Sequence, residues 1–166
     1  MKIAINSPEA MFELGEKIGQ QLKPSDVVVL TGQLGAGKTV LTQGIASAFN
    51  ILGVTSPTFV ISRIHKGVPN FIHIDAYRLL DSDPSNFADL DFESYLASSV
   101  FVIEWGKDFV STLTDQYLSL SSDRLGLKQN SYPIQSQIQS SINNFQNLNL
   151  QNYLDQSPII DRHQYV

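Results

Sequence analysis

The 166-residue sequence contains no cysteine, and its basic residues are fewer than its acidic ones, 11 against 16. Without cysteine the chain has neither disulfides nor thiolate metal sites. The net charge of −5 argues against a broad basic surface for nucleic acid, although it leaves room for a local patch. We therefore expect no binding to DNA.

Long apolar runs are also missing. No stretch approaches the roughly 18 apolar residues that a membrane span needs, and the first residues, MKIAINSPEAMFELGEK, lack the apolar core of a signal peptide. We therefore expect a cytoplasmic protein that does not contact a membrane. With 42% apolar residues the chain is long enough to bury one core, so the sequence predicts a single globular domain.

The strongest motif is DVVVLTGQLGAGKTVLTQGIAS, from Asp26 to Ser47. Four apolar residues predict a buried strand, GQLGAGKT matches the G-x-x-x-x-G-K-T loop, and the residues after it predict a helix. Glycines let successive backbone N–H groups face one anion, and the helix adds its positive N-terminal end. Lys38 is expected to reach the β- and γ-phosphates of a nucleotide, and the Thr39 hydroxyl to ligate Mg²⁺.

A second loop follows the motif helix. Thr55-Ser56-Pro57-Thr58-Phe59 carries three hydroxyls beside a stiff proline, at the place where switch loops sense a γ-phosphate. An ordinary polar turn explains this spacing equally well. The residues expected to bind the nucleotide are Gly32, Gln33, Leu34, Gly35, Ala36, Gly37, Lys38, Thr39, Val40 and Thr58.

Two strands are predicted next, Phe59–His65 and Asn70–Asp75, joined by the short segment KGVP. Because that connection is too short for a crossover helix, the pair is expected to be an antiparallel hairpin. Asp75 ends the second strand, where ligands of open α/β sheets gather, so it is a candidate for Mg²⁺; a solvated strand end is the alternative. His73 shares its face of the strand, and a structural role is favoured for it.

A further buried strand is predicted at Val100–Ile103, and it closes with Glu104 and Trp105. An apolar strand that ends in an acid follows the logic of the Walker B motif, which carries a carboxylate to the metal or to the attacking water. Glu104, Asp75 and Lys38 are therefore the catalytic candidates, and Thr39, Glu104 and Asp75 the metal candidates. Trp105 could stack near a nucleotide or close the core, and the core is favoured.

The remaining sequence predicts supporting elements. An edge strand is expected at Lys2–Asn6, and a helix begins after the N-cap Ser7 with an apolar face of Met11, Leu14, Ile18 and Leu22. Short helices are expected between Ser85 and Leu96, then a helix after Lys107 and a strand at Tyr117–Leu120.

The character of the chain changes after Leu127. Half of the residues from Gln129 to Val166 are Gln, Asn or Ser, and their periodicity is weak. We expect residues 1–127 to form the P-loop domain and residues 128–166 a loosely packed or disordered tail, with short helical pieces near Ile142–Leu154.

Three classes of P-loop protein compete: GTP-binding switches, small-molecule kinases and large motor ATPases, and the last need far more chain than 166 residues. GTP-binding switches usually carry an N-K-x-D motif and a D-x-x-G after the second strand. The sequence has no N-K-x-D, and Asp75, at the end of the second strand of the predicted hairpin, is followed by Ala76-Tyr77-Arg78. Small-molecule kinases usually have a lid with several arginines, whereas the arginines here are scattered, at Arg63, Arg78, Arg124 and Arg162. A small ATPase, a small-molecule kinase and a nucleotide-dependent regulator that needs no turnover all stay open on the residues alone.

Four motifs taken together are more specific. GQLGAGKT (Gly32 to Thr39), TSPTF (Thr55 to Phe59), HIDAYRL (His73 to Leu79) and VIEW (Val102 to Trp105), in this order and spacing, closely resemble the TsaE (YjeE) family. The resemblance covers roughly Met1 to Leu120. The polar residues from Asp123 onward depart from the strand-forming sequence with which members of the family generally finish.

The resemblance implies an α/β fold: a single P-loop NTPase domain with a mixed parallel and antiparallel sheet flanked by helices. It also implies a protein that binds ATP and Mg²⁺, hydrolyses ATP slowly alone, and acts with the TsaD–TsaB pair in the threonylcarbamoyladenosine modification of tRNA. By position, Lys38 and Thr39 would serve the phosphates and metal, and Asp75 and Glu104 the metal and hydrolysis. Contact with tRNA would be indirect, through that pair.

Overall fold

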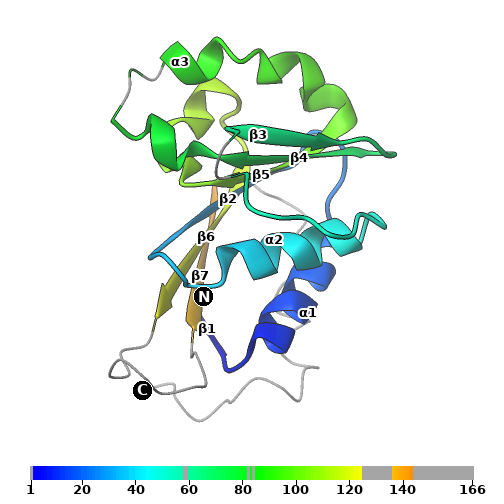
Figure 1. Ribbon diagram of the computed structural model, residues 1–166, viewed down its shortest axis with the longest axis vertical. Coiled ribbons are helices and arrows are strands. Elements are labelled where there is room, and N and C mark those ends of the chain that lie inside the picture. The colour runs from blue at the N-terminus through cyan, green and yellow to red at the C-terminus, as the bar shows by residue number, and fades with distance from the viewer. Residues whose placement is uncertain (1, 58–59, 82, 84, 125–135, 144–166) are drawn as a thin grey trace.

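The computed structural model describes residues 2–57, 60–81, 83, 85–124 and 136–143. Within these residues the strands form one seven-stranded sheet in the order β1-β7-β6-β2-β5-β4-β3 (Figure 1). The strands are β1 (Lys2–Ile5), β2 (Val27–Gly32), β3 (Ser62–His65), β4 (Asn70–Asp75), β5 (Ser99–Glu104), β6 (Tyr117–Arg124) and β7 (Ser136–Asn143). The central strands β6, β2, β5 and β4 run parallel to one another, and β1, β7 and β3 pair antiparallel to their neighbours. The sheet is mixed, as the sequence predicts.

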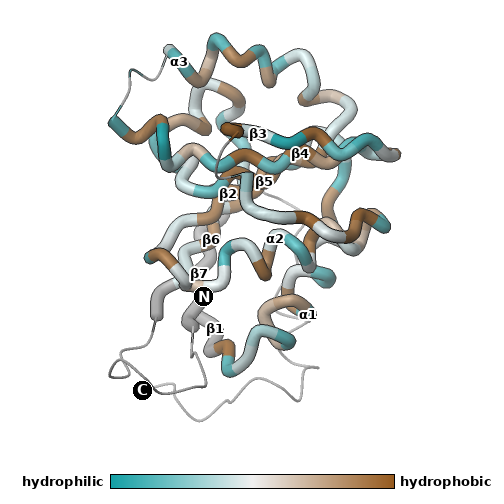
Figure 2. The backbone as a smooth tube through the Cα atoms, viewed as in Figure 1, coloured by the Kyte–Doolittle hydropathy of each residue, from teal (hydrophilic) through white to brown (hydrophobic). Residues whose placement is uncertain are grey.

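Each face of the sheet carries its own hydrophobic core. The helices α1 (Pro8–Gly19) and α2 (Lys38–Ser47) pack together over one face, on alternate residues of the strands such as Val28, Phe71 and Val102. The other face is covered by short elements: α3 (Ser85–Ala88) and the 3-10 helices η1 (Ala76–Leu79), η2 (Phe92–Ser98), η3 (Gly106–Asp108) and η4 (Val110–Thr112). Figure 2 shows the hydrophobic residues of the central strands and of the segments over them in brown.

Strand β2 is buried on both faces. Val27, Val28 and Val29 have no exposed surface, since β2 lies between β5 and β6 and under α1 and α2. Such an unbroken apolar run is typical of a central parallel strand. The sequence predicts this strand and its burial, and both are confirmed.

Helix α1 begins and packs as its sequence predicts. Ser7 has extended backbone angles and accepts a hydrogen bond from the Ala10 N–H at 3.1 Å, and Pro8 opens the first turn. Gly15 lies against Gly44 of α2: a Cβ built on Gly15 would be 2.9 Å from the Gly44 Cα. The two helices therefore approach more closely than side chains at these positions would allow.

Several predicted elements are confirmed with changed bounds. The hairpin of β3 and β4 is antiparallel, and the acid-rich segment from Ser85 forms two short helices. The expected helix after Lys107 is instead a pair of 3-10 turns, because its buried residues Phe109, Val110 and Leu113 hold it close to the sheet. Strand β6 continues to Arg124, four residues beyond the predicted end.

The largest difference lies in the polar C-terminal region. Ser136–Asn143 forms β7, which pairs with β6 on one side and with β1 on the other. Its polar residues lack the apolar pattern that would predict a strand, but its backbone N–H and C=O groups form hydrogen bonds with the two neighbouring strands. This part of the predicted loose tail, including Ile142, is a strand of the sheet; the remainder of the predicted helical stretch, 144–154, lies outside the described residues. Among the described residues, no helix is both long and apolar enough to cross a membrane.

Candidate functional site

A pocket of about 670 Å³ opens beyond the carboxyl ends of β2, β4 and β5. Residues from five segments distant in sequence meet there: the end of β1 with the start of α1, the glycine-rich loop, the loop at Ser56, the end of β4 and the end of β5. Its lining is Ile5, Ser7, Pro8, Met11, Leu34, Gly35, Gly37, Lys38, Thr39, Val40, Ser56, Asp75, Tyr77, Glu104 and Trp105. Open α/β sheets bind their ligands at this end of the strands.

The glycine-rich loop needs its glycines at three positions. Gly32, Gly35 and Gly37 have φ values of 133°, 75° and 88°, in a region that side-chain-bearing residues rarely adopt. Gly37 is the N-cap of α2, so the loop passes directly into the positive end of that helix. This is the local geometry of an anion-binding loop.

Strand β6 supports the loop from beneath. The Ser122 hydroxyl donates to the Ala36 carbonyl at 2.5 Å, and Ser122 is buried. Gly32 lies against the same residue, because a Cβ there would approach the Ser122 carbonyl oxygen to 1.9 Å. Sequence reasoning missed Ser122, which is separated from Ala36 by 86 positions and carries no motif of its own.

Lys38 lies inside the pocket with its ammonium group on the loop. Nζ donates to the carbonyl of Gly32 at 2.8 Å and to that of Gln33 at 3.0 Å, and lies 4.3 Å from the ring centroid of Trp105. Burial lowers the pKa of Lys38, while the nearby Glu104 and Asp75 act in the opposite direction. A partly desolvated ammonium gains from an anion that binds beside it, and a divalent cation bound with that anion would offset its repulsion by the two acids.

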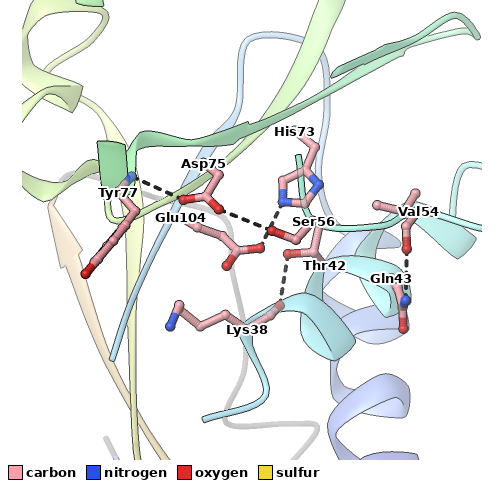
Figure 3. Close-up of polar contacts among 9 residues, drawn as sticks. All are labelled: Lys38, Thr42, Gln43, Val54, Ser56, His73, Asp75, Tyr77 and Glu104. Atoms are coloured by element: carbon pink, nitrogen blue, oxygen red, sulfur yellow. Dashed lines mark hydrogen bonds and ion pairs between the residues drawn. The ribbon is translucent and has the colours of Figure 1, made fainter. Parts of the chain in front are cut away.

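Asp75 and Glu104 face the pocket from neighbouring parallel strands. They are directly opposite each other in the register of β4 and β5. Asp75 is held by two donors, the Ser56 hydroxyl at 3.2 Å from Oδ2 and the Tyr77 N–H at 3.1 Å from Oδ1 (Figure 3). The hydroxyl-rich loop thus contacts the acid directly.

Glu104 is nearly buried and has a buried partner. Oε1 lies 2.9 Å from Nε2 of His73, and the side chains of Glu104 and His73 are 5% and 0% exposed. Figure 3 shows the side chains of both acids near that of Lys38, and all three residues line the pocket. Trp105 is half-buried and lines the pocket, and its ring lies edge-on to that of Tyr77 with the ring centroids 5.3 Å apart. The favoured prediction that Trp105 closes the core is therefore corrected.

The structure brings most of the predicted residues together. Leu34, Gly35, Gly37, Lys38, Thr39, Val40, Asp75 and Glu104 line one pocket. Gly32, Gln33 and Ala36 belong to the same loop but do not line it, and their carbonyls accept the hydrogen bonds described above. Thr58 lies outside the described residues.

The N-terminal segment contributes to the pocket, which the single motifs do not predict. Ile5, Ser7, Pro8 and Met11 line the pocket, although Met11 was predicted only as a core residue. No local signal marks them. Tyr77 and Trp105 had a usable signal, since each follows one of the two acids within a motif.

The donor atoms fit Mg²⁺. Thr39, Asp75 and Glu104 offer hydroxyl and carboxylate oxygens, which hard cations prefer. Among the residues that the structure describes, no group of three His, Cys, Asp or Glu side chains could hold a metal ion.

Comparison with known proteins identifies the family. Residues 5–131 match the family model described as threonylcarbamoyl adenosine biosynthesis protein TsaE. Proteins described as tRNA threonylcarbamoyladenosine biosynthesis protein TsaE are similar in sequence. The one from Mycobacterium bovis is 43% identical over 126 residues, 70% of this chain and 75% of that protein. The one from Rickettsia conorii is 33% identical over 161 residues, 95% of this chain and 89% of that protein.

A solved structure agrees with these matches. The crystal structure of YdiB from Bacillus subtilis superposes with a TM-score of 0.72 at 26% identity and covers 93% of both chains. The family match extends past Leu120, where the motif resemblance ended. The chain therefore belongs to the TsaE family, whose role lies in the biosynthesis of threonylcarbamoyladenosine in tRNA.

Proposed function

We propose that this chain is the Mg²⁺-dependent ATPase of the tRNA threonylcarbamoyladenosine machinery, slow alone and active with the TsaD–TsaB complex. One observation carries the proposal. The glycine-rich loop with Lys38 faces Asp75 and Glu104 across a single pocket at the carboxyl ends of parallel strands. Membership of the TsaE family supports the biological setting.

The phosphates of ATP would bind at the loop. Gly35 and Gly37 present their backbone without side chains, and α2 starts at the loop with its free N–H groups. Lys38 would exchange its two carbonyl acceptors for phosphate oxygens, which carry full negative charge. The gain from that exchange would offset the desolvation that lowers the pKa of Lys38.

The base of the nucleotide would use the apolar part of the same pocket. Ile5 lines it from the end of β1, Pro8 and Met11 from the first turns of α1, and Val40 from the first turn of α2. Ligand pockets combine such apolar walls with a few polar groups that fix orientation.

Hydrolysis would depend on the two acids. Glu104 ends a rigid, buried strand and can accept a proton from an attacking water or orient it. Asp75, held by Ser56 and Tyr77, would turn its carboxylate toward the metal shell, together with the Thr39 hydroxyl. When bound, Mg²⁺ would neutralise charge on the phosphate oxygens.

The pocket has few positively charged side chains, and this explains why hydrolysis would depend on partner proteins. Among the described residues that line the pocket, Lys38 is the one with a positive charge, and no arginine is present. Phosphoryl transfer commonly needs a second cation at the transition state. We propose that Arg63, Arg78 or a residue of TsaD–TsaB supplies it. The net charge of −5 fits a subunit that meets tRNA only through that complex.

The decisive experiment measures ATP hydrolysis by the purified chain with and without TsaD and TsaB. We expect Glu104→Gln to bind ATP normally and to lose about 100-fold or more of its stimulated rate, the size of a general-base effect. Lys38→Ala should lose ATP binding itself, measured by calorimetry. Asp89→Asn, an exposed acid beyond α3, is the matched control and should behave as wild type.

The same assays separate the alternatives. If Glu104→Gln hydrolyses ATP at the wild-type rate with both partners present, the role given to that carboxylate is wrong. If tRNA modification proceeds fully with this variant, the chain is a nucleotide-dependent regulator that needs no turnover. Transfer of the γ-phosphate to an added metabolite would instead indicate a kinase.

A further inference from the structure

His73 is the buried partner of the pocket acid Glu104. It lies in β4 with no exposed surface, two residues before Asp75, and its Nε2 is 2.9 Å from Oε1 of Glu104. Figure 3 shows the imidazole reaching across to the carboxylate of the neighbouring strand. Glu104 lines the pocket and His73 does not, so His73 contacts Glu104 from outside the pocket.

The strand register makes this contact a fixed feature of the sheet. His73 pairs with Val102 of β5, and Glu104 follows two residues later on the same face. His73 and Glu104 are therefore diagonal neighbours, within reach of two long side chains. Phe71 and Val102 continue this face into the core under α1 and α2, which leaves the imidazole little freedom.

The surroundings of the imidazole indicate where its proton lies. Nδ1 of His73 is buried and has no hydrogen-bond partner among the described residues, whereas Nε2 faces a carboxylate oxygen. A proton on Nδ1 would be a buried donor without an acceptor. The lone pair of Nε2 would then face a lone pair of Oε1, and the two atoms would repel each other. We assign the tautomer with the proton on Nε2, which donates to Oε1.

We propose that His73 is the positioning residue for Glu104: its Nε2–H holds Oε1 and thereby leaves the second carboxylate oxygen directed to the reacting water or the metal shell. The proposal rests on the function proposed for the pocket. Glutamate has a longer, more flexible side chain than aspartate, so an acid at this place needs a donor to fix it. Asp75 has its own donors, Ser56 and the Tyr77 N–H. Each acid is thus held by a separate group.

A role in packing alone predicts different behaviour. If His73 only fills space between β4, β5 and the helices, an apolar residue of similar size should preserve catalysis once the protein is folded. If it positions Glu104, the loss should appear in kcat and not in the affinity for ATP, because Glu104 acts on hydrolysis and Lys38 on binding.

The test uses three substitutions in the full chain with TsaD and TsaB. His73→Leu removes the donor at similar volume, His73→Asn places an amide at the Nδ1 position, too short to reach Oε1, and His73→Gln places an amide N–H at the Nε2 position. We expect kcat to fall about 10- to 100-fold in the first two, as for other partners that orient functional groups. His73→Gln should recover most of kcat. ATP affinity, measured by calorimetry, should stay close to wild type in all three.

Two results would overturn the proposal. One is a wild-type kcat in His73→Leu; the other is a kcat in His73→Gln as low as in His73→Leu when both are folded and bind ATP.

A spectroscopic readout separates this inference from the proposed function. In ¹⁵N NMR of the free chain we expect the Nε2–H tautomer of His73, with an Nε2 shift that moves in Glu104→Gln. Finding the proton on Nδ1 refutes the positioning role even if hydrolysis is normal. Absence of hydrolysis in the wild type, with this tautomer and shift present, refutes the ATPase and retains the contact.

Discussion

Substitution of Gly44 by alanine should loosen the contact on which the wall of the pocket depends. Gly44 lies in α2 where this helix crosses α1, and a Cβ at Gly44 would approach the Phe12 carbonyl oxygen to 2.1 Å and the Gly15 Cα to 2.9 Å. Ordinary contact begins near 3.4 Å. Because the closest atom belongs to the backbone of α1, no rotation of a side chain can relieve the clash.

The expected effect combines two opposing terms. Alanine gains about 1 kcal/mol over glycine in a helix interior. Overpacking of a core costs about 1–3 kcal/mol, and a contact between two helix backbones belongs at the upper end. We therefore expect a net loss of about 2 kcal/mol in the free energy of unfolding. For a chain of this size that lowers Tm by about 4–8 °C.

Thermal and urea unfolding followed by circular dichroism measure this loss. Gly53→Ala is the comparison for strain without a clash: its Cβ would meet no atom within 4 Å, so its cost is limited to the strain of φ at 71°, about 1–2 kcal/mol. Because Gly53 does not line the pocket, this variant should keep the ATP affinity of the wild type. Since α1 also carries Pro8 and Met11 of the pocket lining, ATP affinity of Gly44→Ala should fall as well. A Gly44→Ala protein as stable as the wild type would refute the reasoning, because helix propensity would then outweigh the contact.

Two further predictions concern the glycine-rich loop. Thr39→Ala should raise the Mg²⁺ concentration needed for half-maximal hydrolysis, because it removes a hydroxyl ligand, and an unchanged Mg²⁺ dependence would remove Thr39 from the metal shell. Ser122→Ala should weaken ATP binding about 2- to 10-fold in calorimetry, because it removes the hydrogen bond to the Ala36 carbonyl, worth about 0.5–1.5 kcal/mol. Ser121→Ala at the adjacent position is the control. Equal ATP affinity of the two variants would contradict a supporting role for Ser122.

Local patterns predicted the elements that position the site. The apolar run at Val27–Leu30, the N-cap at Ser7 and the short KGVP connection each depend on neighbours in sequence, and the structure has the strand, the helix start and the hairpin in place. Strand β7 was not predicted, because its pairing does not depend on neighbours in sequence. Its residues are polar, and their pairing with β1 and β6 depends on backbone groups that any sequence carries.

The sequence by itself determined which chemical groups are present, because glycines, a lysine, a threonine and two strand-ending acids are the residue types that a phosphate and a metal require. Only the tertiary structure decided which other residues these groups contact. His73 against Glu104, Ser56 against Asp75, Ser122 beneath the loop and Met11 in the pocket wall are contacts between segments far apart in the chain. Strand register and helix packing set such contacts, and periodicity in the sequence indicates which face of an element is buried but not which distant residue it meets.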